Sequence, residues 1–198
     1  VLVLRALMEI FERTGPYSTA VEFADRAFKR LELEERERGI VLGMRGCAWL
    51  LLGKSEESIQ DLREASRLAA QEKDQGLESH TLAWLGRVLL RSGNLEEAVE
   101  ATNRAVDVAL RSGSGTDLQR ALLFRAKYES QTGQNLHSIA TYREGLALAQ
   151  SSGNSHYEIR LLTGMGQVEA ETGMEAEGQT HLEQALNLVK KQNDPRYE

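Results

Sequence analysis

Apolar residues recur at intervals of three and four positions along most of this chain. One stretch illustrates the pattern with two successive sets: Leu82, Leu85 and Leu89, then Leu95, Val99, Val106 and Leu110. Such spacing places apolar side chains on one face of a helix, so two successive sets indicate two amphipathic helices. The alternating apolar and polar positions typical of a half-buried strand do not compete with this pattern. The chain is therefore predicted to be all-α.

Glycines divide these helical sets at an almost constant spacing. They stand at Gly15, Gly53, Gly93, Gly133 and Gly173, which are separated by 38, 40, 40 and 40 residues. A fixed period in this range is typical of a solenoid, in which each unit buries its apolar face by stacking on its neighbours. We predict one domain, a right-handed α-solenoid of five helix-turn-helix units. The expected units cover about 1–35, 36–74, 75–114, 115–154 and 155–192, with a tail at 193–198.

When the five units are aligned on their glycines, fourteen of the fifteen residues at three further positions are Gly, Ala or Ser, the exception being Met8. Seven residues before the turn stand Met8, Gly46, Gly86, Ala126 and Gly166; five after it, Ala20, Ser58, Ala98, Ser138 and Gly178; twelve after it, Ala27, Ala65, Ala105, Gly145 and Ala185. Glycine inside a helix costs about 1 kcal/mol relative to alanine, so its recurrence needs a packing reason. Close crossing of the two helices supplies that reason.

Polar segments and capping residues predict where the helices begin and end. Asn94 with Glu97 has the pattern of a capping box at the second helix of unit three, and Pro16 stands where a first-turn proline is tolerated. The breaks between units are expected at 73–76, 112–116, 151–155 and 193–195, which are rich in Gly, Ser, Asn and Asp.

These positions resemble the tetratricopeptide repeat, which has Leu-Gly in its first helix, Gly at the turn and two Ala in its second helix. Leu85-Gly86, Gly93, Ala98 and Ala105 carry the resemblance, and it extends over essentially the whole chain. The period is longer than the usual 34 residues, and the proline that normally closes the second helix is missing. Longer repeats of this type are similar to those of Pins-type polarity adaptors and of bacterial regulators with helical sensor arrays.

The resemblance implies that the first helix of each unit lines a concave groove that binds a peptide. The residues expected to line it are Gly43, Met44 and Cys47; His80, Trp84, Arg87 and Arg91; Arg120, Phe124, Lys127 and Gln131; and Arg160, Thr163 and Gln167. Arg87, Lys127 and Gln167 occupy one equivalent position of successive units, and Trp84 and Phe124 occupy another. Cations beside aromatic rings suit a peptide with carboxylates and apolar anchors. Asparagines that clamp a peptide C-terminus in some family members are absent.

Charge supports this interpretation without excluding simpler ones. The net charge is −6 and the pI is near 5.4, which disfavours nucleic acid or an anionic membrane as partner, and no apolar stretch is long enough to cross a bilayer. The acidic residues collect on the second helices, for example at Glu96 and Glu97, whereas cations mark the first helices. Trp84 and Phe124 could equally pack against the neighbouring unit, and helical Lys and Arg often form a solvated face.

The pattern offers no support for catalysis or for a cofactor. Gly53-Lys54-Ser55 lacks the first glycine of a phosphate-binding loop and joins two helices. The four histidines lie far apart along the chain without metal-ligand spacing, so no metal site is expected. Cys47, the one cysteine, has no histidine in its own unit, and we expect a buried or groove-lining thiol in a reducing, cytoplasmic compartment.

The predicted function is therefore a non-enzymatic scaffold that binds proteins or peptides with acidic and apolar side chains. The first alternative is a sensor or regulatory segment of a larger signalling or transcription regulator, which the apolar start at Val1 and the absence of an initiator Met favour. The second is self-association into a homodimer through Leu182, Leu186 and Val189 of the last helix.

Overall fold

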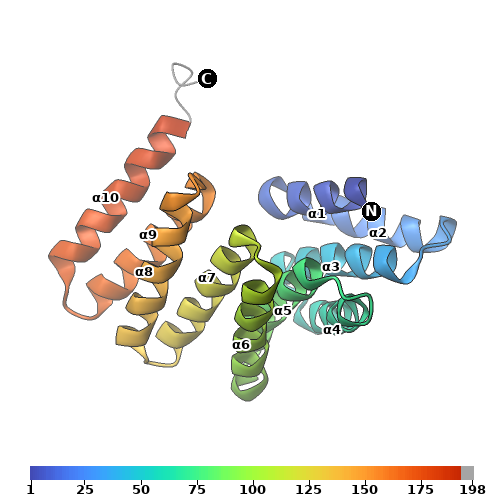
Figure 1. The fold of residues 1–198 in the computed structure, drawn as a ribbon, viewed down its shortest axis with the longest axis horizontal. Helices are drawn as coiled ribbons and strands as arrows, with labels where there is room; N and C mark the ends of the chain where they lie inside the picture. The colour runs from blue at the N-terminus through green and yellow to red at the C-terminus, as the bar shows by residue number, and fades with distance from the viewer. Residues whose placement is uncertain (193–198) are drawn as a thin grey trace. The chain divides into compact units, whose positions relative to one another are not determined.

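The computed structural model describes residues 1–192, which form ten α-helices joined by short turns, without a strand among them (Figure 1). The helices are α1 (Leu2–Thr14), α2 (Tyr17–Arg30), α3 (Glu35–Leu51), α4 (Ser55–Gln71), α5 (Gln75–Arg91), α6 (Leu95–Ser112), α7 (Gly115–Gln131), α8 (Asn135–Ser151), α9 (Ser155–Glu171) and α10 (Glu175–Gln192). Successive helices pair as hairpins, so the prediction of an all-α chain of five two-helix repeats is confirmed.

The helices form two compact units, the first made of the first three repeats and the second of the last two. The first, Val1–Gly113, contains α1 to α6, and the second begins at Ser114 and contains α7 to α10. The boundary lies within the polar segment expected between the third and fourth repeats. The expected break at 193–195 and the tail at 193–198 lie outside the described residues.

The turns within repeats two to five have the same backbone conformation. Gly53, Gly93, Gly133 and Gly173 have φ angles of 83°, 81°, 79° and 85°. This left-handed region carries a steric cost for residues with a Cβ atom, so the turn itself accounts for the recurring glycine.

Close contact between paired helices explains the small residues of the repeat. In the second repeat, Ser58 Oγ donates a hydrogen bond of 2.7 Å to the carbonyl oxygen of Gly46, and Ser138 Oγ makes the equivalent 2.8 Å bond to Ala126 in the fourth. A Cβ atom added at Gly86 would lie 2.5 Å from Thr102 Cγ2. The helix axes therefore approach too closely for larger side chains at these crossings.

The capping pattern differs from the prediction. Asn94 is the N-cap of α6, but its side chain accepts no cap hydrogen bond, and the capping box found in the structure joins Glu34 and Glu37 at α3. Asp74 has nearly the same backbone angles as Asn94 and does cap its helix. Whether the side chain accepts the cap hydrogen bond therefore depends on its rotamer, which the residue type alone does not specify. Pro16 is the N-cap of α2, one position before the helix begins.

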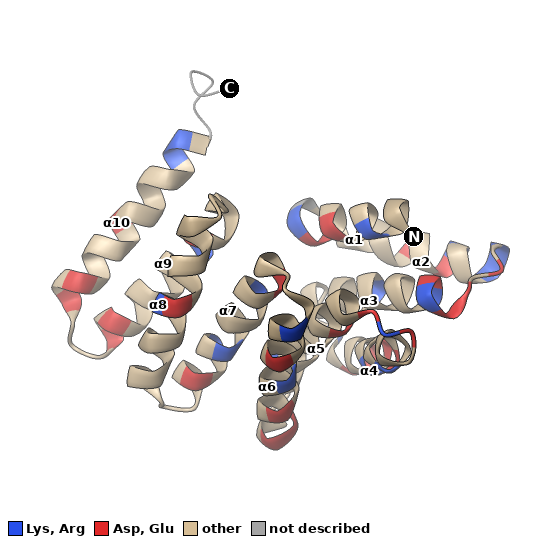
Figure 2. Cartoon of the chain, viewed as in Figure 1, with Lys and Arg blue, Asp and Glu red and all other residues tan. Residues whose placement is uncertain are grey.

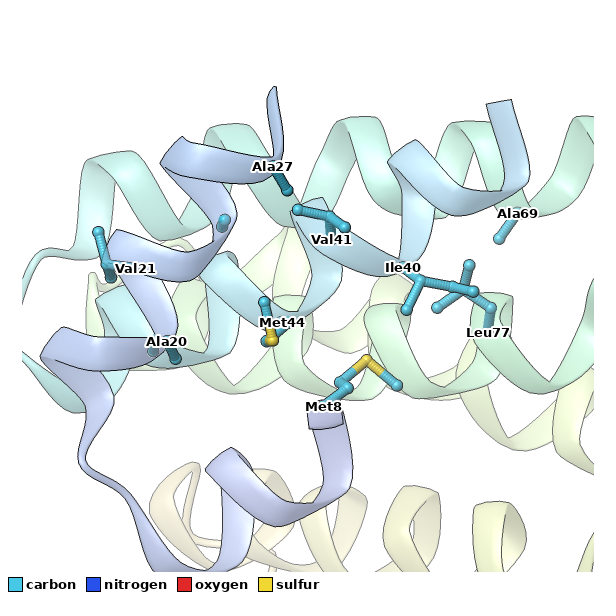
Figure 3. Close-up of a cluster of buried hydrophobic side chains, with 11 residues drawn as sticks. Met8, Ala20, Val21, Ala27, Ile40, Val41, Met44, Ala69 and Leu77 are labelled. Atoms are coloured by element: carbon cyan, nitrogen blue, oxygen red, sulfur yellow. The ribbon is translucent and has the colours of Figure 1, made fainter. Parts of the chain in front are cut away.

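Helix α1 packs differently from the first helices of the other repeats. It contacts α3 more extensively than its hairpin partner α2, whereas α3 and α5 pack chiefly on their own partners, α4 and α6. Met8 of α1 joins a buried cluster that also contains Ala20, Met44 and Leu77 (Figure 3). In the first unit, α1 therefore packs on the first helices of the next two repeats, α3 and α5.

Polar links also join the two helices of the second repeat to each other and to the first repeat. Arg45 of α3 donates to both oxygens of Asp61 on α4, at 2.7 and 2.9 Å, and to Asp25 on α2 at 2.7 Å. Its guanidinium lies 4.9 Å from the centre of the Phe28 ring. Hydrogen bonds to Asp61 raise the pKa of Arg45 above its usual value.

None of the helices in residues 1–192 combines the length and the apolar character that crossing a membrane requires.

Candidate peptide-binding surface

The residues predicted to bind a peptide lie on the first helices of three repeats, and the two compact units hold separate groups of them. Helix α5 of the first unit carries His80, Trp84, Arg87 and Arg91. Helices α7 and α9 of the second unit carry Arg120, Phe124, Lys127, Gln131, Arg160 and Gln167. Acidic residues stand at the starts of three second helices, α4, α6 and α10, as Figure 2 shows for α6 and α10.

In the first unit, an arginine covers a buried tryptophan. Trp84 is only 3% exposed, so the alternative in which this ring packs inside the repeats is the one found in the structure. The Arg87 guanidinium lies 4.9 Å from the centre of the Trp84 ring, one helical turn along α5, and is half-buried. Arg91, which is exposed, donates from Nη1 to the carbonyl oxygen of Leu50 at 3.2 Å. The cations are therefore held in place by a ring and by the end of α3.

In the second unit, two arginines surround two buried aromatic rings. Phe124 is 2% exposed and Tyr157 is 5% exposed. The Arg160 guanidinium lies 5.7 Å from the Phe124 ring centre and 5.5 Å from the Tyr157 ring centre. Arg120 lies 6.0 Å from the Tyr157 ring and donates to Asp117 Oδ1 at 2.7 Å. Helices α7 and α9 thus share one arginine-aromatic cluster.

Tyr157 is the member of this cluster that the sequence prediction missed. It lies in the first turn of α9, one helical turn before Arg160, so the aromatic-x-x-Arg spacing of Trp84 and Arg87 recurs there. That shared spacing was the available signal. The other polar residues of the set differ in exposure, because Lys127 is half-buried whereas Gln131 and Gln167 are exposed.

The predicted groove residues of the second repeat are not open to solvent. Met44 and Cys47 are 3% and 2% exposed, and a Cβ atom added at Gly43 would lie 3.1 Å from Thr81 Cγ2 and 3.7 Å from Met8 Sδ. His80, which we also expected to line the groove, is 3% exposed and lies against α1. These expectations are wrong because α1 covers this part of α3 and α5.

Comparison with family models identifies one family over most of the chain. The model described as anaphase-promoting complex subunit 5 matches residues 13–90 and again residues 87–157, so the two matches together span 13–157. Comparison with curated proteins gave no match.

Several solved structures share this fold, and the first of them is described as a set of tetratricopeptide-like repeats. Repeats from a putative kinesin light chain of Podosopora anserina superpose with a TM-score of 0.68, at 17% identity over 97% of this chain and 96% of that one. BtubC from P. vanneervenii gives a TM-score of 0.73 at 11% identity, over 96% of this chain and 80% of that one. Aspartyl phosphate phosphatase F from Bacillus subtilis gives 0.66 at 14% identity, over 98% and 60%. At these identities the likeness shows the fold, and the tetratricopeptide-type resemblance is confirmed.

Proposed function

The chain belongs to the anaphase-promoting complex subunit 5 family, and from this premise we propose that it is a non-enzymatic scaffold that binds a protein or peptide with acidic side chains. The family takes its name from a subunit of a complex, which supports a role in protein interaction. The helical hairpins within each unit supply rigid helix faces, and a preformed surface loses little conformational freedom on binding.

The observation that carries the acidic preference is the stacking of arginines on buried rings. Arg87 lies over Trp84, and Arg160 lies over both Phe124 and Tyr157. A guanidinium held against an aromatic face keeps its hydrogen-bond donors in a fixed plane, which suits the two oxygens of a carboxylate. The rings therefore act here as supports for the cations, in place of the open apolar anchors that the sequence suggested.

Arginine positions in the two units favour the same kind of ligand. Each unit presents a half-buried arginine over a ring, and Lys127 adds a further half-buried cation in the second unit. Charge-assisted hydrogen bonds to such groups contribute about 1.5–3 kcal/mol each, more than an exposed surface ion pair. Acidic segments of a partner protein fit this arrangement better than basic or neutral ones.

Charge reversal tests the proposal. We expect Arg87→Glu with Lys127→Glu to weaken binding of a fluorescent acidic peptide at least about tenfold, because two cations are lost and two repelling charges are gained. Binding is measured by fluorescence anisotropy at two salt concentrations, beside a basic peptide of equal length. The unaltered protein should bind the acidic peptide alone, and more weakly at high salt.

The matched control changes the same charge elsewhere. Arg111 on α6 and Arg143 on α8 are exposed residues of second helices, one in each unit, so Arg111→Glu with Arg143→Glu alters the net charge equally. Equal loss of affinity in both double variants would point to net charge, and no loss in either would refute the proposed surface. Circular dichroism verifies that both variants fold.

Two further features belong to this proposal. A cytoplasmic location fits one cysteine that is buried and outside any disulfide. The apolar residues Leu182, Leu186 and Val189 of α10 are 37%, 52% and 37% exposed, so homodimer formation through α10 stays a prediction. Light scattering on the peptide-binding samples measures the mass and decides it.

A further inference from the structure

Three side chains from three different helices of the first unit meet beneath α1. Cys47 Sγ on α3 lies 3.9 Å from His80 Nε2 on α5, and the same nitrogen lies 3.8 Å from Glu12 Oε2 on α1. One ligand atom from each of the three residues lies within 4.8 Å of the other two. The sequence separations of 35 and 33 residues (47 − 12 and 80 − 47) gave no sign of this grouping.

We propose that Glu12, Cys47 and His80 form a Zn²⁺ site. A thiolate, an imidazole and a carboxylate are the three protein groups that bind zinc, at bond lengths of about 2.0–2.3 Å. A tetrahedral ion with such bonds separates its ligand atoms by roughly 3.4–3.6 Å. The separations of 3.9 and 3.8 Å need to shorten by a few tenths of an ångström. The third pair, Cys47 and Glu12, lies within 4.8 Å and needs to close by up to about 1.4 Å, which rotation of the long Glu12 side chain supplies.

The donor set selects the metal. A thiolate is a soft ligand that favours zinc over magnesium or calcium, which take oxygen ligands. Three protein ligands leave the fourth position of a tetrahedral ion for a small exogenous ligand such as water. The expectation of no metal site rested on spacing along the chain. Such spacing cannot show that ligands from separate repeats meet in the folded structure.

Burial favours an ion over a larger ligand. Cys47 and His80 are 2% and 3% exposed, and the Glu12 side chain is 11% exposed. A substrate that would react with the thiol cannot reach Cys47 in this arrangement, whereas a metal ion can enter beside the partly exposed carboxylate. A bound cation would also offset the cost of holding a carboxylate at a largely buried position.

Metal binding would fasten α1 to the rest of the unit. Helix α1 packs little against α2, and Arg5 pairs with Asp74 at the start of α5. Zinc would add bonds from α1 to both α3 and α5. Binding to the folded state alone stabilises that state, so α1 is where the effect should be largest.

The test is to strip the full chain of metal with a chelator and then titrate it with Zn²⁺. We expect one ion per chain by isothermal titration calorimetry, and slower amide exchange in α1 when zinc is present. Co²⁺ is the spectroscopic probe, because coordination by Cys47 produces a thiolate-to-cobalt charge-transfer band. Cys47→Ser and His80→Gln should each weaken Zn²⁺ binding at least about a hundredfold.

Two further variants keep the proposal open to refutation. His137→Gln changes an exposed histidine of α8 and should leave zinc affinity unchanged. Glu12→Gln alters the most exposed of the three residues and carries the test if either buried variant fails to fold by circular dichroism. Lack of zinc binding by the folded chain, or equal affinity in Cys47→Ser, His80→Gln or Glu12→Gln, would overturn the site.

Discussion

Glycines at the crossing of α9 and α10 face each other across a very short gap. A Cβ atom added at Gly166 would lie 2.8 Å from the carbonyl oxygen of Gly178, and one added at Gly178 would lie 2.7 Å from the carbonyl oxygen of Gly166. Both neighbours are backbone atoms, which can move only if a helix moves. Close packing of the two helices therefore accounts for glycine at these two positions, despite its low helix propensity.

Gly166→Ala should destabilise the protein although alanine is the better helix former. The added methyl group forces α9 and α10 apart, at a cost of about 1–3 kcal/mol, which the gain of about 1 kcal/mol in helix propensity does not fully offset. Urea unfolding of the full chain measures the change. Gly115→Ala is the control, since a Cβ atom there meets nothing within 4 Å, and it should be neutral or stabilising. Equal stability of both variants would contradict the packing account.

Among the helices, the buried carboxylate of Asp74 connects α1 and α3 with the start of α5. Asp74 caps α5 by accepting a hydrogen bond from the Leu77 amide at 3.1 Å. It also pairs with Arg5 of α1 and with Arg36 of α3, the latter at 2.9 Å. Burial by itself would raise the pKa of Asp74, but the hydrogen bonds from Arg5, Leu77 and Arg36 outweigh it and lower that pKa. The charged form is therefore the one that holds these helices together.

The lowered pKa of Asp74 predicts how Asp74→Asn depends on pH. A carboxyl group with a depressed pKa in the folded state stabilises the protein above its unfolded pKa, near 4, and loses this contribution as pH falls through the folded value. At pH 7 the variant should lose about 1–2 kcal/mol, since both arginines are partly exposed. The difference from the unaltered protein should shrink below about pH 4. Urea unfolding at several pH values measures it, and a difference that grows on acidification would refute the explanation.

At the scale of the whole molecule, the two compact units are built from the same kind of local contact. Helices pack on their hairpin partner and on the next repeat, as α3 does on α4 and α8 does on α9. In such an array, stability is close to a sum of repeat and neighbour terms, without one central core. The consequences of a substitution should therefore remain near the repeat that carries it.

Hydrogen exchange can test this locality in the intact chain. We expect Gly166→Ala to speed amide exchange in α8, α9 and α10 of the second unit while leaving α3 and α4 of the first unit nearly unchanged. Mass spectrometry of peptic fragments gives the rates for each helix. A uniform increase across both units would indicate one cooperative domain instead.

The candidate site was predictable in part. The equivalent positions of successive repeats predicted cations beside aromatic rings, and Arg87 lies over Trp84, because residues three apart share a helical face. Whether the ring or the arginine faces outward depends on neighbouring repeats, and both Trp84 and Phe124 proved to be buried. His80 followed the same helical spacing, yet it lies under α1.

The sequence by itself determined the number of repeats, the two helices in each and the close crossing between them, because these follow from local periodicity, left-handed glycine turns and small residues a fixed distance apart. Tertiary structure alone decided that α1 lies against α3 and α5, that Arg160 covers Phe124, and that Glu12, Cys47 and His80 meet. Those contacts join different repeats. Their geometry depends on how whole helices pack, which spacing along the chain does not encode.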